Sequence, residues 1–386
     1  YGVAEAYQYG NGVKIDYKEA VKWYEKAADQ RLTEALTELG YDYKFGNMNL
    51  SINYGKSFAY YIQAAQKGDV AGQANIAEFY MEGKGIEKNE EEALKWYRKA
   101  AEQGDADSEY AIGQYYECDR NDIKLAIEWY KKAAEQGHVD AQIKMKNCYG
   151  SGKGLKKDLT QAFEWAEKAA EQGDAQAQCY LGRCYKDGLG VEADKNTAIE
   201  WYKKAAEQGD AEAQCELGKC YDIFCAFNKL YIKKNEEKAL EWYKKARDQG
   251  YSEAQYRYGN AYRHYSGNSD IGARYRIAEA WIKKAADNKN PCIEACLDIA
   301  DGHYAMMDEH GERRKKALVG SSLLAGLGAV VTVPVALAEN AVIKSVKVEK
   351  FLKTTDEGKE MMKYYRKAAA LGSEKAKKRI KEIENY

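Results

Sequence analysis

The phrase AIEWYKKAAEQGDAEAQ, residues 198–214, decides the fold because degenerate copies of it recur along the chain. In each copy one register position holds Trp or Tyr, and KAA or a close variant follows it. This column consists of Trp23, Tyr60, Trp96, Trp129, Trp165, Trp201, Trp242, Trp281 and Tyr364. Steps of 36 or 37 residues are the commonest between neighbouring copies. An internal period of this length is typical of repeat arrays, which bury a core only by stacking their units.

The composition favours helix throughout. The chain has 386 residues, of which 31% are charged, and only two prolines, Pro291 and Pro334. Such sequences are compatible with helix almost everywhere. The net charge of −1 provides no overall field for nucleic acid or an anionic membrane, so we expect no nucleic-acid partner.

Each repeat is predicted to contain two helices. Helix A is represented by residues 177–188, in which Ala177, Leu181 and Tyr185 form one apolar stripe at i, i+4 and i+8. Gly188 then ends the helix, because glycine tolerates the left-handed conformation of many helix stops. Gly182 is predicted to let a neighbouring backbone come close.

Helix B covers the phrase itself. Ala198, Trp201 and Ala205 form its predicted buried stripe, with Tyr202 as a further candidate, and Gly209 ends it. A second column of Tyr residues, Tyr7 to Tyr262, precedes the Trp column, and His303 replaces the last Tyr.

These two halves resemble the Sel1-like repeat family, a relative of the tetratricopeptide repeats. The resemblance rests on A-x-x-x-L-G-x-x-Y-x-x-G-x-G-V and A-x-x-W-Y-x-K-A-A-x-x-G, and it covers nearly all of the chain outside residues 311–355. It implies an all-α, right-handed α-solenoid of nine helix-A/helix-B repeats whose A helices line a concave face. It also implies a non-catalytic scaffold or adaptor that binds proteins or peptides. The chain departs from the pattern at residues 245–247, which read KAR, and in the missing GxGV after Tyr116 and Tyr221.

The repeat pattern predicts three segments. Residues 1–310 form the repeat array, residues 311–355 a hydrophobic helical insertion, and residues 356–386 the last helix B with a charged capping helix. The chain begins at Tyr1 inside a helix A, so we expect that a preceding cap or repeat has been removed. A secretion signal further upstream stays open.

No pattern of catalytic chemistry stands out. A Walker loop, HExxH, GxSxG and paired CxxC are all absent, and the GxGV segments recur once per repeat as turns would. Cys292, Cys296, His303 and His310 share one helix face. However, Cys296 and His303 would lie about 10 Å apart along the axis, too far to share one metal. The sequence therefore predicts a core stripe, with no metal, no cofactor and no enzyme activity.

The nine cysteines show no pairing pattern. Cysteines in equivalent positions of adjacent A helices would lie about 8–10 Å apart, beyond disulfide reach. Unpaired thiols favour a reducing compartment, so we expect a cytoplasmic protein without disulfides, with membrane association left open.

A partner is predicted to bind the A-helix side that faces away from the apolar columns. Counted from the Ala of helix A, positions +2, +3 and +6 point there. In the middle repeats these positions hold Tyr110, Gln114, Lys144, Asn147, Tyr180, Arg183, Glu216, Lys219, Tyr256, Arg257 and Asn260. Tyr beside Arg is typical of binding hot spots, and alternating basic residues would suit an acidic or extended peptide. An ordinary solvated face is the alternative.

Residues 317–338 form an uncharged stretch of 22 residues. As helix it would span about 33 Å, enough to cross a bilayer. One crossing would separate the two helices of the last repeat, so we favour an inserted hairpin. A structural lid, a docking or self-association surface, and membrane contact remain open, the last making the protein a membrane-recruited effector. The expected contact residues are Leu323, Leu324, Leu327, Val330, Val331 and Val333.

Overall fold

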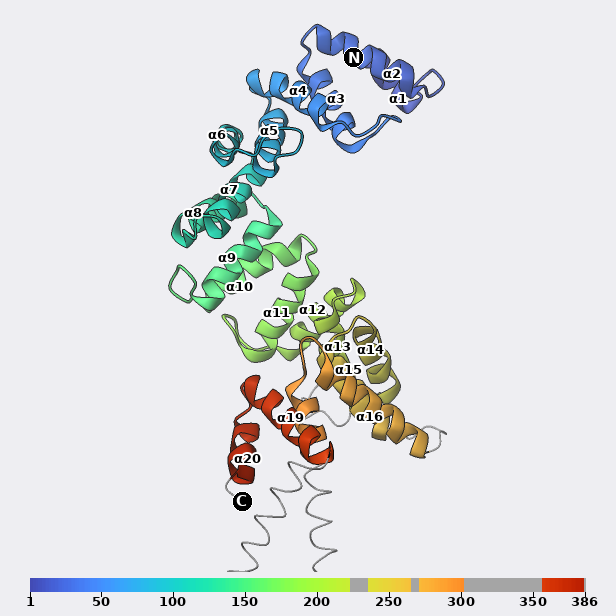
Figure 1. Cartoon of the computed structure of the whole chain (residues 1–386), viewed down its shortest axis with the longest axis vertical. Coiled ribbons are helices and arrows are strands. Elements are labelled where there is room, and N and C mark those ends of the chain that lie inside the picture. The colour runs from blue at the N-terminus through green and yellow to red at the C-terminus, as the bar shows by residue number, and fades with distance from the viewer. Residues whose placement is uncertain (223–234, 265–270, 302–355, 385–386) are drawn as a thin grey trace, which may run out of the picture. The chain divides into compact units, whose positions relative to one another are not determined.

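The computed structural model describes residues 1–222, 235–264, 271–301 and 356–384, and these residues form helices joined by short turns (Figure 1). They divide into two compact units, Tyr1–Asp194 and Lys195–Tyr386. The first unit contains α1 (Gly2–Tyr9), α2 (Tyr17–Asp29), α3 (Thr33–Phe45), α4 (Tyr54–Gln66), α5 (Val70–Glu82), α6 (Glu90–Ala101), α7 (Ala106–Cys118), α8 (Ile123–Glu135), α9 (Val139–Ser151), α10 (Leu159–Glu171) and α11 (Ala175–Asp187). The second contains α12 (Lys195–Glu207), α13 (Ala211–Tyr221), α14 (Glu236–Asp248), α15 (Ser252–His264), α16 (Ile271–Asp287), a helical segment at 293–301, α19 (Asp356–Ala370) and α20 (Glu374–Glu384).

The helices stack in the predicted A/B order. Odd-numbered helices up to α15 are A helices, and within each unit an A helix packs against the B helix that follows it. Figure 1 shows α6 and α8 along one side of the first unit and α5 and α7 along the other. The all-α repeat architecture is therefore confirmed. The proposed boundaries of an insertion at 311–355 lie outside the described residues and stay a prediction.

The repeated Gly and Asp residues set the helix ends. Gly188 follows α11 with φ 69°, in the left-handed region that glycine adopts without a Cβ penalty. Asp210 caps α13, because its carboxylate accepts a hydrogen bond from the backbone N–H of Ala213 at 2.7 Å. The GD in the phrase EQGDAEAQ thus ends one helix and starts the next.

The core of helix B differs from the prediction. Tyr202 is buried, whereas Trp201 is only half-buried and carries the Lys204 ammonium 4.0 Å above its ring. The same arrangement recurs at Tyr130 and Tyr243, which are also buried. Consecutive helical residues point about 100° apart, so only one of the two aromatic residues can face helix A. The predicted buried stripe was wrong at this position: the Tyr enters the core and the Trp lies at its edge under a lysine.

The glycine of helix A makes room for that tyrosine. A Cβ at Gly113 would lie 2.6 Å from ring carbons of Tyr130, and one at Gly218 would lie 2.6 Å from ring carbons of Tyr243. At Gly259 the obstructing atom is instead the backbone carbonyl oxygen of Ala278, at 2.8 Å. Neighbouring groups therefore come close at these glycines, but the predicted backbone approach occurs only at Gly259 of the three, and at Gly113 and Gly218 the approaching group is a ring.

Buried glutamines connect consecutive repeats. Gln142 donates its side-chain amide to the Ala134 carbonyl at the end of α8, 3.2 Å away, and accepts from Gln172 of the next repeat at 3.0 Å. Gln172 also donates to the Gly137 carbonyl at 2.9 Å. The same bonds join Gln73 to Gln103, Gln214 to Gln249, and Gln255 to Asn288. We call this series the glutamine ladder. It explains why the repeated phrase has glutamine, and not an apolar residue, at the positions of Gln142 and Gln172.

Replacing Gln142 with alanine is expected to lower the free energy of unfolding by about 2 kcal/mol, because it leaves the Ala134 carbonyl and the Gln172 amide without their partner. Urea unfolding followed by circular dichroism measures this loss. Gln63→Ala on the exposed face of α4 is the matched control and should change little. Equal midpoints for the two variants would show that the ladder does not stabilise the repeats.

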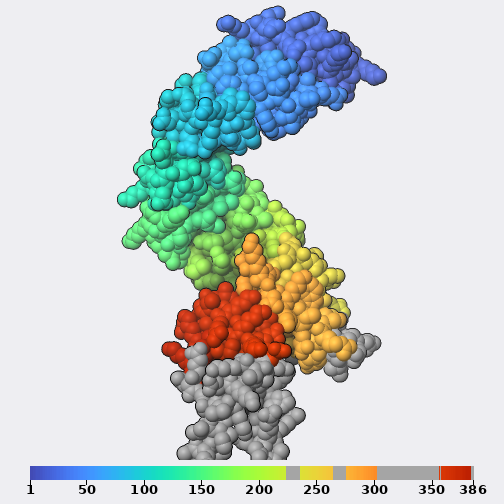
Figure 2. All heavy atoms as spheres, viewed as in Figure 1, coloured from blue at the N-terminus to red at the C-terminus, as the bar shows by residue number. Residues whose placement is uncertain are grey.

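The C-terminal helices close the second unit. Tyr364 and Tyr365 of α19 are buried and donate their hydroxyls to Asp287 at 2.9 Å and Asp301 at 2.7 Å. Figure 2 shows residues 356–384 packed directly against residues 271–301. In α20 only a narrow apolar side is buried, as predicted for a capping helix. Over the ranges the structure describes, no helix is both long and apolar enough to cross a membrane.

Candidate functional site

The predicted partner-binding residues lie on the A helices, along the side where successive repeats meet. Gln114, Asn147 and Arg183 are exposed; Tyr110, Lys144, Tyr180, Lys219, Tyr256, Arg257 and Asn260 are half-buried. We call this side the A-helix face. The binding role of these residues stays a prediction.

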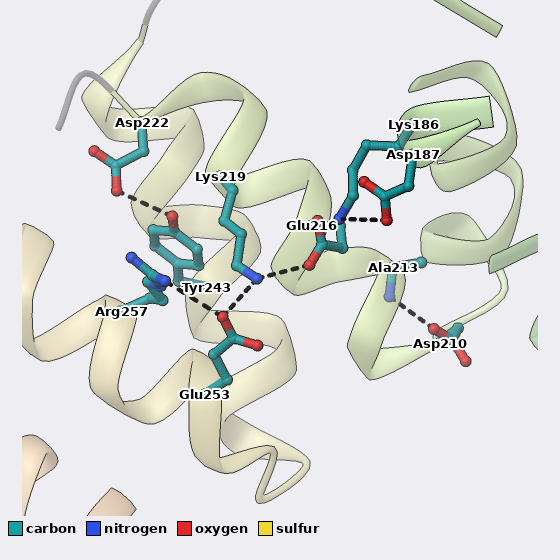
Figure 3. A network of polar contacts seen from close by, with 10 residues as sticks. All are labelled: Lys186, Asp187, Asp210, Ala213, Glu216, Lys219, Asp222, Tyr243, Glu253 and Arg257. Atoms are coloured by element: carbon teal, nitrogen blue, oxygen red, sulfur yellow. Dashed lines mark hydrogen bonds and ion pairs between the residues drawn. The ribbon is translucent and has the colours of Figure 1, made fainter. Parts of the chain in front are cut away.

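In the second unit, Lys219 is the centre of an ion network (Figure 3). Its ammonium lies 2.6 Å from the Glu216 carboxylate on α13 and 2.5 Å from the Glu253 carboxylate on α15. Arg257 lies 3.5 Å from the same Glu253 oxygen. The side chains of Lys219 and Glu216 are each only 12% exposed. The structure therefore brings Lys219 and Arg257 together through Glu253, a residue that the sequence analysis missed.

The charge of Lys219 is fixed by this network. Burial works to lower its pKa, but Cys215, Glu216 and Glu253 more than offset that effect and raise the pKa above its ordinary range. Two carboxylates then neutralise the ammonium where α13 meets α15. Lys219 thus stabilises the stacking of repeats and is poorly placed to attract an acidic ligand on its own.

The first unit contains a similar network around Glu117 of α7. Its carboxylate accepts hydrogen bonds from Lys144 at 2.7 Å, Lys153 at 2.9 Å and the Tyr130 hydroxyl at 2.8 Å. The bond from Lys144 is the main cause that lowers the pKa of Glu117 to about 2, although burial opposes it. The register of Glu117 could have identified it from the sequence. Glu117 directly follows Tyr116 in the Tyr column, and it faces Lys144 at position +3 of the next helix A.

Tyr110 is held by aromatic contacts rather than exposed to a ligand. Its ring stacks on His138 with centroids 4.5 Å apart and also contacts the Tyr130 ring at 5.5 Å. His138 caps α9, where its Nδ1 accepts a hydrogen bond from the Ala141 N–H at 3.2 Å. Its Nε2 lies 3.3 Å from Asp107.

Tyr180 combines an aromatic face with nearby cations. The Lys146 ammonium lies 4.7 Å from its ring centroid and the Arg183 guanidinium 5.2 Å from it. Burial is the first cause that raises the pKa of Tyr180 to about 12. Tyr256 has a looser contact of this kind, with Arg257 5.8 Å from its ring. The Tyr–Arg pairs that the sequence predicted are therefore adjacent in space.

The described residues offer little metal or thiol chemistry. Within these ranges no group of three or more His, Cys, Asp or Glu side chains could hold a metal ion. Cys292 and Cys296 are buried, and burial raises the pKa of both thiols, that of Cys292 to about 12. The other two members of the predicted stripe, His303 and His310, lie outside the described residues. None of the eight cysteines in the described ranges forms a disulfide.

The six predicted contact residues of the apolar stretch, Leu323 to Val333, also lie outside the described residues. Their role as a lid, a protein interface or a membrane element stays a prediction.

The sequence matches the model of one repeat family in nine segments. The Sel1 repeat model matches residues 1–32, 33–69, 70–105, 106–138, 139–174, 175–210, 211–251, 252–290 and 362–373. The last, short match covers the C-terminal part of α19, the predicted helix B that follows the insertion.

Solved structures support the same architecture. A protective antigen present in uropathogenic Escherichia coli strains, which displays an SLR fold, aligns with 97% of this chain and 69% of its own at 28% identity and a TM-score of 0.74. A Sel1 repeat protein from Oxalobacter formigenes aligns with 64% of this chain and 99% of its own at 32% identity and a TM-score of 0.53.

Curated relatives match over shorter lengths. The chitin synthase regulator SKT5 of Saccharomyces cerevisiae is 33% identical over 129 residues, which are 31% of this chain and 18% of that protein. The putative sel1-like repeat-containing protein L21 of Acanthamoeba polyphaga mimivirus is 36% identical over 110 residues, or 28% and 19% of the two chains. The chain thus spans less than a fifth of either relative.

Proposed function

Because the chain belongs to the Sel1 repeat family, we propose that it is a non-catalytic scaffold that binds a protein or peptide segment along its A-helix face. Proteins built from Sel1 repeats are generally protein-interaction scaffolds, and their helical solenoid is typically non-catalytic. That the chain has a protein or peptide partner, and that a segment of this partner binds along the A-helix face, are both part of the proposal.

One observation carries the choice of face. Large polar and aromatic side chains that the core does not need stand in successive repeats of the first unit at the same register. Gln114, Asn147 and Arg183 are exposed at position +6 of α7, α9 and α11, and Tyr180 lies half-buried beside Arg183. A row with this spacing offers an extended chain hydrogen bonds and an aromatic surface at regular intervals.

The electrostatics change the expected ligand. Lys144 and Lys219 were expected to attract an acidic peptide, but both are bonded to carboxylates of the neighbouring A helix. We therefore propose that the middle repeats recognise an extended segment mainly by hydrogen bonds and ring contacts, with Arg183 as the exposed cation.

Peptides selected from a random 12-residue display library on the intact chain test this proposal. We expect the double variant Gln114→Ala/Asn147→Ala and the single variant Tyr180→Ala to weaken the selected peptides about 10-fold, the size of a modest hot spot. Fluorescence anisotropy with a labelled peptide measures the change in Kd.

The control is Glu128→Ala/Lys131→Ala on the exposed side of α8. If it weakens binding while the A-helix variants do not, the partner binds the B-helix side and the proposal is wrong. Circular dichroism of each variant shows whether its fold is retained.

Membrane recruitment through residues 317–338 remains the alternative. No observation on the described residues favours it, and it is kept as a prediction from the sequence alone.

A further inference from the structure

The A-helix face of the first two repeats differs from the rest in chemistry. On α3, Glu38, Tyr41 and Phe45 follow one another at i, i+3 and i+7 and so share one stripe. On α1, Glu5 and Tyr9 occupy the register positions that Tyr41 and Phe45 occupy on α3. We call these five residues the acidic aromatic patch.

The aromatic members of the patch are open to solvent. Tyr9 is 61%, Tyr41 49% and Phe45 52% exposed, and the Tyr41 and Phe45 rings contact each other with centroids 4.6 Å apart. Most of the large hydrophobic side chains that the described ranges expose lie in residues 1–52. Clustered exposed aromatics of this kind mark interaction sites more often than single ones do.

The carboxylates of the patch have no counterion among the residues that the structure describes. No ion pair involves Glu5 or Glu38 within the residues the structure describes. Lys44, the cation of α3, lies 5.4 Å from the Phe45 ring centroid, but its charge is paired on α5, where it bonds to Glu78 at 2.6 Å and Asn75 at 2.8 Å. On α13 the register position of Glu5 holds Lys219, and on α15 the register position of Glu38 holds Arg257. Both of these cations pair with Glu253.

A buried carboxylate beside the patch is a second observation that favours the binding of a cation. Asp42 lies one helical turn after Glu38 and next to Tyr41, on the same side of α3, and is only 1% exposed. Its Oδ2 is buried and has no hydrogen-bond partner in the structure. Other repeats hold a buried cysteine at this register, Cys148 in α9 and Cys220 in α13. A buried carboxylate oxygen without a partner is costly, so its presence beneath an acidic surface calls for a compensating group.

The pKa directions agree with this geometry. Burial and then the Glu38 charge raise the pKa of Asp42, and burial and then the Glu5 charge raise that of Glu38. These carboxylates repel one another across α1 and α3. A cation placed between them would relieve the repulsion and is therefore bound more tightly than at an isolated carboxylate.

We propose that the acidic aromatic patch binds a lysine or arginine side chain of an extended segment in the protein partner. Glu5 and Glu38 would pair with the cationic group, Tyr9, Tyr41 and Phe45 would contact its stem and its charge, and Asp42 would deepen the negative potential beneath. A side chain fits better than a bare metal ion, because half of the patch is aromatic surface that a hydrated ion does not use. This inference rests on the proposed binding of a peptide segment to the A-helix face and names the charge of one of its anchors.

Three labelled 14-residue peptides of equal apolar content test the inference on the intact chain. Four shared positions carry Arg in the first peptide, Gln in the second and Glu in the third. Fluorescence anisotropy at low and moderate salt should give the tightest Kd for the Arg peptide, and Glu5→Gln/Glu38→Gln should weaken that peptide about 10-fold. Tyr41→Ala/Phe45→Ala should weaken both the Arg and the Gln peptide, and the Arg peptide more, because it removes the ring contacts with the charge as well as those with the stem.

Glu91→Gln/Glu128→Gln, which removes the same charge from exposed sites on α6 and α8, is the matched control and should leave all three Kd values unchanged. The inference is overturned if the Arg peptide binds no tighter than the Gln peptide, if the control weakens it as much as Glu5→Gln/Glu38→Gln does, or if none of the three binds. Tight binding of the Gln or Glu peptide that Tyr180→Ala weakens would leave the proposed function standing and reject only the basic anchor. The glutamine variants remove like-charge repulsion, so their melting temperatures should equal or exceed that of the parent chain.

Discussion

Gly113→Ala is expected to lower the free energy of unfolding by about 2 kcal/mol, although it adds only a methyl group to a helix. The added Cβ would lie 2.6 Å from ring carbons of Tyr130. That ring cannot withdraw easily, because it is fully buried and its hydroxyl donates to Glu117 at 2.8 Å. Ala4 and Ala300 occupy the same register in other repeats, so an alanine is tolerated when a whole repeat is built around it. The expected loss is therefore moderate.

The chain contains a matched control for this substitution. Gly150→Ala makes the same change in α9, where the nearest atoms to the new Cβ lie at 3.7 and 3.8 Å, an ordinary contact. It should keep or raise stability, because alanine favours helix by up to about 1 kcal/mol over glycine. Urea midpoints of the two variants settle the comparison. Similar midpoints would mean that helix propensity, not the tyrosine ring, governs the glycine column.

Asp42→Asn is expected to raise the free energy of unfolding by about 2 kcal/mol at pH 8 and to have little effect below pH 4. Burial, with the Glu38 charge, raises the pKa of Asp42 from 3.8 to about 6, while a hydrogen bond from Asn47 opposes the shift. A raised pKa of a carboxyl group means that the folded state holds its proton longer than the unfolded state. The protonated Asp42 therefore stabilises the fold fully below pH 4, and that contribution is lost as the pH rises through about 6.

An asparagine carries no charge at any pH, so the variant escapes this loss. Melting temperatures of the two proteins from pH 3.5 to pH 8 should diverge between about pH 4 and pH 6 and differ by a constant amount above that range. Glu128→Gln, at an exposed site of α8, is the control and should follow the parent at every pH. A stability difference that is the same at pH 4 and pH 8 would show that Asp42 acts through packing and not through its charge.

Sequence reasoning located the elements whose signals are local. The Gly188 stop, the stripe of Ala177 and Leu181, and the A/B alternation depend on residues within one or two turns, and the structure confirms them. The choice between Trp201 and Tyr202 was wrong because two adjacent aromatic residues give nearly equal periodicity. It takes the position of helix A to decide which of them enters the core.

The polar contacts between repeats were out of reach for a different reason. Gln142 and Gln172 are 30 residues apart, and Glu117 and Lys144 are 27 apart, so their pairing depends on how one repeat rests on the next. The predicted binding residues do lie on one face, yet the sequence could not show that Lys144 and Lys219 are already neutralised there. It also gave no reason to single out Glu5, Glu38 and Asp42, whose importance lies in the absence of cations around them in the described part of the chain.

The glutamine ladder has a consequence for how such a chain can change in length. Each of these amide–amide bonds joins a residue only to the repeat next to it, so donor and acceptor lie 30 or 35 residues apart. A duplication or deletion of one whole repeat leaves a matching amide and carbonyl on both sides of the new junction. A deletion of half a repeat leaves two buried amides facing apolar side chains. Only insertions and losses of whole repeats therefore preserve the hydrogen bonds of the ladder. The number of repeats can change in this way while the fold stays the same.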